Sequence, residues 1–218
     1  MKVRIFVLAV VCYTGLMLTG CVSHIPMEEQ TPDLTYLHQE GIVISVVDQR
    51  WRLEEGKSTD EFGVIRTYGI PADAKTYPWY VDKDHKGQSI AQAIEERIVF
   101  GLNDEGWNAT PAELTSPPSE EEIVNILKDK EAKNLLVMII KDWWVDVNTN
   151  WVSDFNFDWD VVVDVYDTSG QSVGHYAGAD RDIVDESASD SWPNMFRRAF
   201  RERLIAILER PEITKALE

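Results

Sequence analysis

Cysteine is nearly absent from this sequence, and this absence limits the chemistry of the chain. Only two of the 218 residues are cysteines, Cys12 and Cys21, and both lie close to the N-terminus. The rest of the chain can therefore form neither a disulfide framework nor a zinc site built on thiolates. The four histidines are widely spaced and make no HExxH-type pair. We therefore expect no bound metal and no cofactor.

Positive charge is also scarce. The chain has 21 Lys and Arg residues against 38 Asp and Glu residues, which gives a formal net charge of −17 at pH 7. Nucleic acids and anionic lipid head groups repel so acidic a protein, so we exclude nucleic acid as a partner. The sequence also lacks the Gly-x-Ser-x-Gly, P-loop and dinucleotide-binding motifs. We predict that the protein is not an enzyme.

A long hydrophobic run is missing as well, although a shorter one opens the chain. Residues 5–18 are mostly apolar and uncharged, and they follow Lys2 and Arg4. This run is too short for the hydrocarbon core of a bilayer, which needs about 20 apolar residues. A positive start followed by a short apolar run is typical of a secretory signal. We predict that residues 1–20 are a signal peptide.

The most specific motif lies at the end of this signal. Leu18-Thr19-Gly20-Cys21 resembles the lipobox of bacterial lipoproteins. The resemblance implies that the Cys21 thiol takes a diacylglycerol, that cleavage occurs before Cys21, and that a further chain such as palmitate acylates the new amine. These acyl chains would anchor the protein almost irreversibly to a membrane. Val22 and Ser23 follow, where lipoproteins retained in the inner membrane often carry Asp, so we predict the outer membrane, with the protein facing the periplasm.

The mature chain is long enough for one domain of ordinary size. Residues 21–40 are polar and contain Pro26 and Pro32, so we predict a tether that begins at the lipidated cysteine. Residues 41–218 would then form a single domain in the periplasm.

The hydrophobic periodicity predicts an α+β fold. Helices are expected at 89–105, 119–131 and 191–210, the first two with capping boxes at Ser89/Gln92 and Ser119/Glu122. Strands are expected at 41–50, 62–68, 134–147, 153–167 and 171–179, with a short extended piece from Trp107. Most of 51–88 is interpreted as a long surface excursion, whose aromatic residues could contact a partner or pack on the domain. This order predicts a two-layer sandwich, a mixed and mainly antiparallel sheet with helices on one face.

Two short patterns suggest a family. One strand ends in Val46-Val47-Asp48-Gln49-Arg50 soon after the predicted tether, and a helix leads into a Gly–aromatic step between Leu102 and Trp107. In these features the chain resembles the YajG-like lipoproteins of the bacterial outer membrane, over roughly residues 41–208. That family is largely uncharacterised, so the resemblance implies a fold and a location more than an activity. Asp48 and Arg50 point the same way on their strand, which favours an ion pair over a binding site.

A hairpin rich in Asp and Trp is the most conspicuous candidate surface. Its candidate residues are Trp144, Asp146, Asp158 and Asp160, which share one surface if the exposed faces of the two strands coincide. A glycosidase pair is one interpretation, but an open strand face does not raise the pKa of one carboxyl as a cleft does. A surface for a cationic or carbohydrate ligand is the second. The third is a solvated face whose charges block pairing with other strands.

The leading hypothesis is a lipid-anchored adaptor or assembly factor without enzymatic activity. Its partners would be the membrane, through the acyl chains on Cys21, and an envelope protein or polymer of unknown identity. The alternative is a binding module that captures a cationic or carbohydrate ligand through the hairpin.

Overall fold

The computed structural model describes residues 24–34, 41–149, 154–184 and 190–218. The predicted signal peptide and the lipidation site Cys21 lie outside these ranges. Within them, no helix combines the length and the apolar character that crossing a membrane requires.

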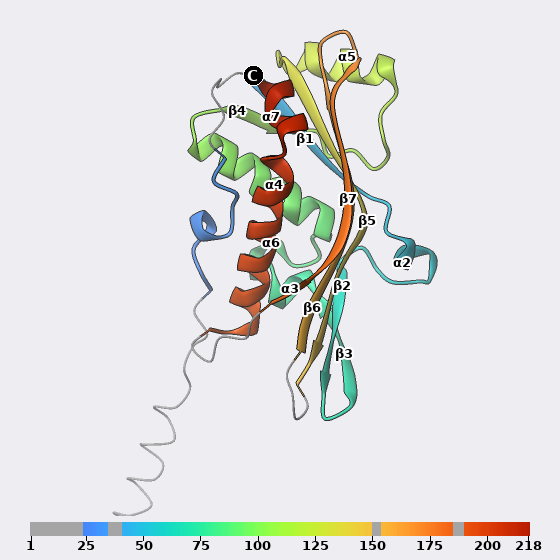
Figure 1. The fold of residues 1–218 in the computed structure, drawn as a ribbon, viewed down its shortest axis with the longest axis vertical. Helices are drawn as coiled ribbons and strands as arrows, with labels where there is room; N and C mark the ends of the chain where they lie inside the picture. The colour runs from blue at the N-terminus through green and yellow to red at the C-terminus, as the bar shows by residue number, and fades with distance from the viewer. Residues whose placement is uncertain (1–23, 35–40, 150–153, 185–189) are drawn as a thin grey trace, which may run out of the picture.

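A mixed sheet of seven strands organises the molecule (Figure 1). Its centre is β5 (Asn134–Asn148), which pairs antiparallel along its whole length with β6 (Asp154–Tyr166). The next strand outward is β7 (Ser172–Ile183), also antiparallel. These three long strands confirm the predicted α+β class with a mainly antiparallel sheet.

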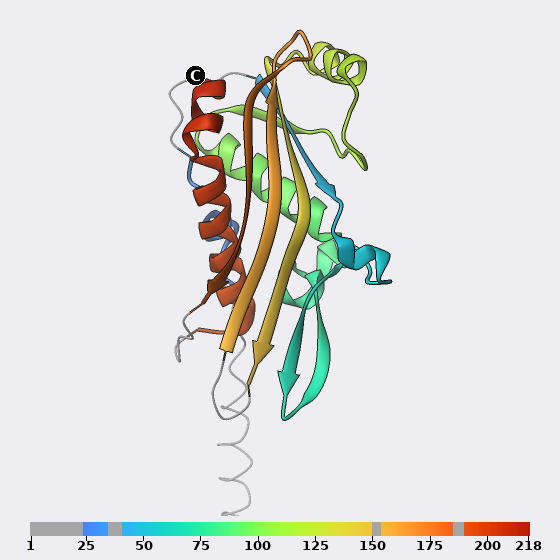
Figure 2. The same ribbon diagram turned by 45° about the vertical axis from the view of Figure 1, so that its right-hand side comes forward.

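The other side of β5 is shared by two strands in succession. The first, β1 (Gly41–Asp48), runs parallel to the first half of β5, and β2 (Glu61–Thr67) runs parallel to its end. The sheet is completed by β4 (Asn108–Pro111), parallel to β1, and by β3 (Ile70–Lys75), antiparallel to β2. The β2–β3 hairpin extends past the helices at the lower end of the molecule (Figures 1 and 2).

A β-bulge at Lys141 decides which side chains of β5 face the helices. Ile140 pairs with Val161, whereas Asp142 pairs with Asp160, so Lys141 is the extra residue. Even-numbered residues of β5 enter the main core before the bulge, and odd-numbered residues enter it afterwards. The bulge therefore places Asp142 and the alternating residues after it on the opposite face.

The helices α4 (Ile90–Asp104), α6 (Trp192–Leu208) and α7 (Pro211–Leu217) cover one face of the sheet (Figure 2). Their apolar sides and the inner face of the sheet form the main core, in which Trp143, Phe157 and Phe200 pack with ring centroids about 5 Å apart. The capping boxes at Ser89 and Ser119 are present as predicted. Pro211 both follows α6 and begins α7, because proline suits the first turn of a helix.

One helix lies on the other face. The helix α5 (Glu120–Asp129) buries Ile123 and Leu127 against β1 and the first half of β5 in a second, smaller core. At the α5 end, helices thus lie on both faces of the sheet. Along the rest of β5 and β6, the long helices lie on one face (Figure 2).

The region 51–88 is built into the domain to a larger extent than a surface excursion. It contains α2 (Trp51–Glu54), β2, β3, α3 (Thr76–Trp79) and the short helix η2 (Lys83–His85). Phe62 and Tyr80 are fully buried, and Trp79 packs on the core. Two aromatic side chains of this region are exposed to solvent, Trp51 at 46% and Tyr68 at 88%.

Residues 24–34, called here the N-terminal strap, lie against α4 and α6. Leu34 is buried, the Ile25 amide donates to Asn194 Oδ1 at 3.1 Å, and Arg201 Nε donates to the Thr31 carbonyl at 2.8 Å. The strap passes so close to Gly101 of α4 that a Cβ there would lie 2.3 Å from the Pro32 carbonyl oxygen. Only glycine therefore fits at this position. This part of the predicted tether is therefore attached to the domain.

Candidate functional site

The four candidate residues of the hairpin do lie on one face of the sheet. Trp144 is paired across the strands with Asp158, and Asp160 lies opposite Asp142. Asp146 follows on the same face of β5, opposite Asn156. We call this region, on the side away from α6, the outer sheet face.

Trp144 is covered rather than open to a ligand. Its side chain is only 6% exposed because the guanidinium of Arg52, from α2, stacks 4.4 Å from its ring centroid. The same guanidinium donates to both carboxylate oxygens of Asp142, each at 3.0 Å. One arginine thus shields the indole and neutralises the nearest acid.

The acids of the outer sheet face are also mostly paired. Asp146 forms an ion pair with Arg66 of β2, and Asp158 is bound by two nitrogens of Arg181 from β7, at 2.5 and 2.9 Å. Among the described residues Asp160 has no cation partner. The chain therefore supplies most of the positive charge that a ligand would have brought, and the binding role of these four residues remains a prediction.

Asp48 and Arg50 form the ion pair that the sequence favoured. Arg50 is 2% exposed and donates from Nε and Nη2 to the two carboxylate oxygens of Asp48, both at 2.8 Å. Its Nη1 also donates to the Glu61 carbonyl and its Nη2 to the Thr59 carbonyl, which ties the end of β1 to the start of β2. The pair therefore stabilises the connection between β1 and β2, which pair with β5 one after the other.

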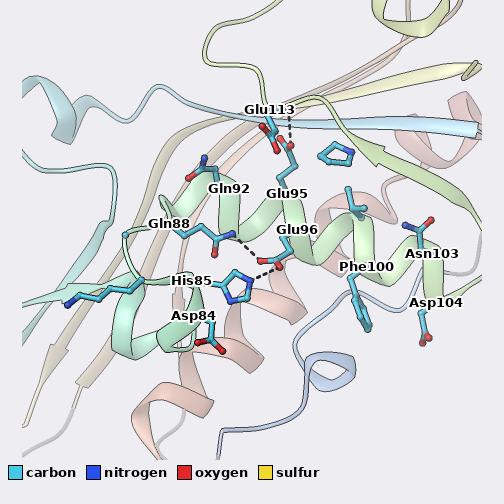
Figure 3. A pocket seen from close by; sticks show the side chains of 14 residues that line it. Asp84, His85, Gln88, Gln92, Glu95, Glu96, Phe100, Asn103, Asp104 and Glu113 are labelled. Carbon is cyan, nitrogen blue, oxygen red and sulfur yellow. Dashed lines mark hydrogen bonds and ion pairs between the residues drawn. The ribbon is translucent and has the colours of Figure 1, made fainter. Parts of the chain in front are cut away.

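A cavity of about 880 Å³ runs along α4. Its floor is the outward face of α4, with the half-buried side chains of Val99 and Phe100. One wall is η2 with the loop after it, and the other is β4 with the loop after it (Figure 3). We call it the α4 groove.

Acidic residues dominate the lining of the α4 groove. Five carboxylates line it, against one lysine, Lys86, and one histidine, His85; they belong to Asp84, Glu95, Glu96, Asp104 and Glu113. Apart from the buried Glu95, three of them, Asp84, Asp104 and Glu113, have no cation partner among the described residues. The groove thus combines an apolar floor with negative charge that the chain leaves uncompensated.

Glu95 is the buried carboxylate of the groove, and its contacts are structural. It is 4% exposed, and its two oxygens accept hydrogen bonds from the backbone N–H groups of Val46 and Glu113, at 2.7 and 3.0 Å. On this side of β1, β4 pairs only as far as Ile44. The Val46 amide therefore has no strand partner there, and Glu95 accepts its hydrogen bond instead. Burial raises the pKa of the Glu95 carboxyl above its usual value in spite of these two bonds.

His85 lies at one end of the groove, between Asp82 and Glu96, and its contact with Glu96 is drawn in Figure 3. Its Nδ1 is 2.8 Å from Asp82 Oδ1, and its Nε2 is 3.3 Å from Glu96 Oε1. The hydrogen bond to Asp82 raises the pKa of His85 and lowers the pKa of Asp82. An acid–histidine pair could activate a hydroxyl or thiol, but the residues that line the groove include no Ser, Thr or Cys.

Two buried arginines hold the N-terminal strap next to this region. Arg97 and Arg197 are 3% and 1% exposed, and both donate to the Tyr80 carbonyl, at 3.0 and 3.2 Å. Arg97 also donates to Gln30 Oε1 of the strap at 2.9 Å. Burial, followed by the proximity of Arg97, lowers the pKa of Arg197 to about 10.

Comparisons with known proteins give distant similarities only. No protein-family model and no curated protein matches the chain. Among solved structures, a Xanthomonas campestris protein described as DUF330 has a TM-score of 0.45 at 12% identity and covers 91% of this chain and 95% of its own. An uncharacterized protein has a TM-score of 0.40 at 10% identity, with 81% and 96% covered.

A third solved structure is the lipoprotein GNA1162 from Neisseria meningitidis, with a TM-score of 0.36 at 9% identity. The match covers 78% of this chain and 99% of that one. These similarities are too distant to indicate a function, and the YajG-like resemblance stays a prediction.

Proposed function

We propose that this protein is a lipid-anchored envelope adaptor without enzymatic activity, which holds a basic segment of a partner protein in the α4 groove. The observation that carries the proposal is the uncompensated negative charge around an apolar floor. The acids of the outer sheet face, in contrast, are mostly neutralised by arginines of the same chain. An occupant with Lys or Arg beside apolar side chains would complement the groove.

The location proposed is the periplasmic side of the outer membrane. It rests on the short apolar signal and the lipobox ending at Cys21, followed by Val22 and Ser23 rather than Asp. The test is Cys21→Ser, which we expect to leave an uncleaved precursor without acyl chains. A variant that is still processed and still floats with outer-membrane vesicles would contradict the anchor.

The absence of enzymatic activity is proposed from the chemistry of the groove. Its buried carboxylate, Glu95, is held by two backbone amides, and its histidine has no hydroxyl or thiol to activate among the lining residues. Hydrolysis of cell-wall or polysaccharide fragments by the purified domain would contradict this part of the proposal.

Peptide binding tests the groove directly. The probe is a fluorescent peptide of alternating lysine and leucine, with fluorescence anisotropy as the readout. Removal of two uncompensated charges by Asp104→Asn with Glu113→Gln should weaken binding about fivefold at low salt, and the difference should shrink as salt is added. The matched control is Glu121→Gln with Asp129→Asn, which removes two exposed acids from α5 and should leave affinity unchanged.

Crosslinking in cells tests the adaptor role. A photoreactive amino acid at Phe100, on the groove floor, should give one discrete adduct with an envelope protein, and Asp104→Asn with Glu113→Gln should reduce its yield. The same photoreactive residue at Glu121 on α5 is the control. Equal adducts from both positions, or none from Phe100, would contradict an adaptor that works through this groove.

A further inference from the structure

The N-terminal strap limits how far the domain can lie from a membrane. Its first contacts are already made at His24, whose Nδ1 is 3.3 Å from Arg197 Nη2, and at Ile25, whose amide bonds Asn194. Farther along, the strap is held by Arg97 through Gln30 and by Arg201 through the Thr31 carbonyl. The chain therefore reaches the domain surface at His24.

This attachment shortens the predicted tether severely. Only Val22 and Ser23 separate Cys21 from His24, and three residue steps of extended chain span about 10 Å at most. A free tether over residues 21–40 would instead reach roughly 65 Å. An acylated Cys21 would therefore hold the domain against the bilayer surface, and the end that carries His24 would face the lipid.

That end of the domain is the one that carries the β2–β3 hairpin. Asn194, the partner of Ile25, lies at the start of α6, and Phe196 from the same turn packs 5.0 Å from Phe155 at the start of β6. β2 runs beside the end of β5 here, and its hairpin with β3 projects past the body (Figures 1 and 2). The opposite end carries α5 and the β6–β7 turn.

The tip of this hairpin carries two large, mostly exposed hydrophobic side chains. Tyr68 is 88% exposed and Ile70 is 72% exposed, and they flank Gly69. Tyr68 and Gly69 both have positive φ, +50° and +79°, which makes a two-residue hairpin turn whose twist suits the strands. Exposure of a tyrosine and an isoleucine at a protruding tip has no role in the packing of the domain.

We propose that the tip Tyr68-Gly69-Ile70 is a second membrane contact, which enters the interfacial layer of the same bilayer that holds Cys21. The inference rests on the proposed lipid anchor. It fixes the orientation of the domain, with the β2–β3 hairpin toward the lipid and α5 toward the periplasm. Tyrosine suits this layer because its ring lies among the acyl chains while its hydroxyl stays hydrated.

Apolar insertion, and not charge, would drive this contact. The net charge of the chain is strongly negative, and the cations near the hairpin are already paired, Arg66 with Asp146 and Lys57 with Asp73. Anionic lipid would therefore not attract the tip from solution. The anchor makes the contact intramolecular, so that a small apolar surface suffices.

Site-specific labelling tests the proposal, because Cys21 is the only cysteine of the mature chain and its sulfur would be blocked by lipid. Acylated protein with Ile70→Cys carries an environment-sensitive fluorophore and is reconstituted into vesicles of phosphatidylethanolamine and phosphatidylglycerol. The control is Thr168→Cys, which labels the exposed β6–β7 turn at the other end. Quenching is measured with lipids that carry a nitroxide at a shallow depth, and with aqueous iodide.

The expected result is strong quenching by the nitroxide lipid at position 70 and none at position 168, with the reverse order for iodide. Adding Tyr68→Ser should reduce the lipid quenching at position 70 by at least about twofold. Equal iodide quenching at both positions, in protein that floats with the vesicles, would overturn the inference but keep the anchor. Protection from iodide without lipid quenching would mean that a second copy of the chain covers the tip, which also overturns it. Protein that does not float with the vesicles would overturn both proposals.

Discussion

Two acidic surfaces of this molecule differ in where their counter-charge comes from. On the outer sheet face, arginines from α2, β2 and β7 lie on the aspartates of β5 and β6, and one of them also covers Trp144. In the α4 groove, acids from η2, α4 and the loop after β4 gather around Phe100 with little positive charge among them. A row of acids therefore indicates a binding surface only where the chain leaves it uncompensated.

The two surfaces also differ in what their charges do for stability. An ion pair on the sheet is partly open to water, where such pairs contribute little. Glu95 in the groove is buried and serves two backbone amides, one of which no strand can satisfy. We therefore expect substitutions of Glu95 in the α4 groove to lower the free energy of unfolding more than substitutions on the outer sheet face.

Glu95→Ala should have the largest effect. It removes both acceptors and leaves the Val46 amide buried without a partner, which should cost about 2–4 kcal/mol of unfolding free energy. Urea denaturation followed by circular dichroism measures it. The neighbouring control is Glu96→Ala, at a half-buried acid with only side-chain partners, and a loss as large as that of Glu95→Ala would remove the structural role assigned to Glu95.

The Glu95 carboxyl should also make stability depend on pH. Since burial raises its pKa in the folded state, the folded protein holds this proton at a pH where the unfolded chain has lost it. The contribution of Glu95 to stability therefore falls as pH rises from its unfolded pKa through its folded pKa. The difference in denaturation midpoint between wild type and Glu95→Gln should change across this window, and a constant difference would contradict the raised pKa.

Arg52→Ala is the strongest change we expect on the sheet side. It uncovers the Trp144 ring and leaves Asp142 without its two hydrogen bonds, at a cost of about 1–2 kcal/mol. A double-mutant cycle with Asp142→Asn should give a coupling of about 1 kcal/mol. Independent effects of the two changes would mean that the arginine acts only by covering the indole.

His85 should show a smaller, local effect. Because its hydrogen bond to Asp82 raises its pKa, the imidazole should titrate above 6.5 in an NMR pH series, and Asp82→Asn should bring the value down. The stabilising contact is complete below the unfolded pKa and is lost as pH rises through the folded pKa. Asp84→Asn is the matched control, since its side chain has no described contact with the ring, and an equal shift from it would contradict the assigned cause.

The sequence predicted the regular elements well because their signals are local. The capping boxes at Ser89 and Ser119 and the apolar first half of β5 each fix an element within a few residues. The bulge at Lys141 and the burial of Tyr80 were not predictable in this way, because they depend on strands and helices far along the chain.

The candidate surfaces show the same difference between local signals and contacts from distant segments. The alternation of β5 and β6 predicted that Trp144 and Asp158 share a face, and they do. It could not show that Arg52, 90 positions before Asp142, would lie over them. The α4 groove was missed for a similar reason: the polar face of α4 is visible in the sequence, but its walls come from separate segments that only the fold brings together.

Asp158→Asn with Asp160→Asn should have the smallest effect, and it tests the comparison most directly. If the outer sheet face is already neutralised by Arg181 and its neighbours, the two changes remove no charge that a ligand could use. Affinity for the lysine–leucine peptide should then stay within about twofold of wild type, in contrast to Asp104→Asn with Glu113→Gln. Asp160 is the one candidate acid without a described cation partner, so Asp160→Asn alone shows whether it contributes. A loss of affinity that disappears at high salt would place the ligand on the hairpin, as in the alternative function predicted from the sequence. It would contradict the proposal that the α4 groove is the binding surface.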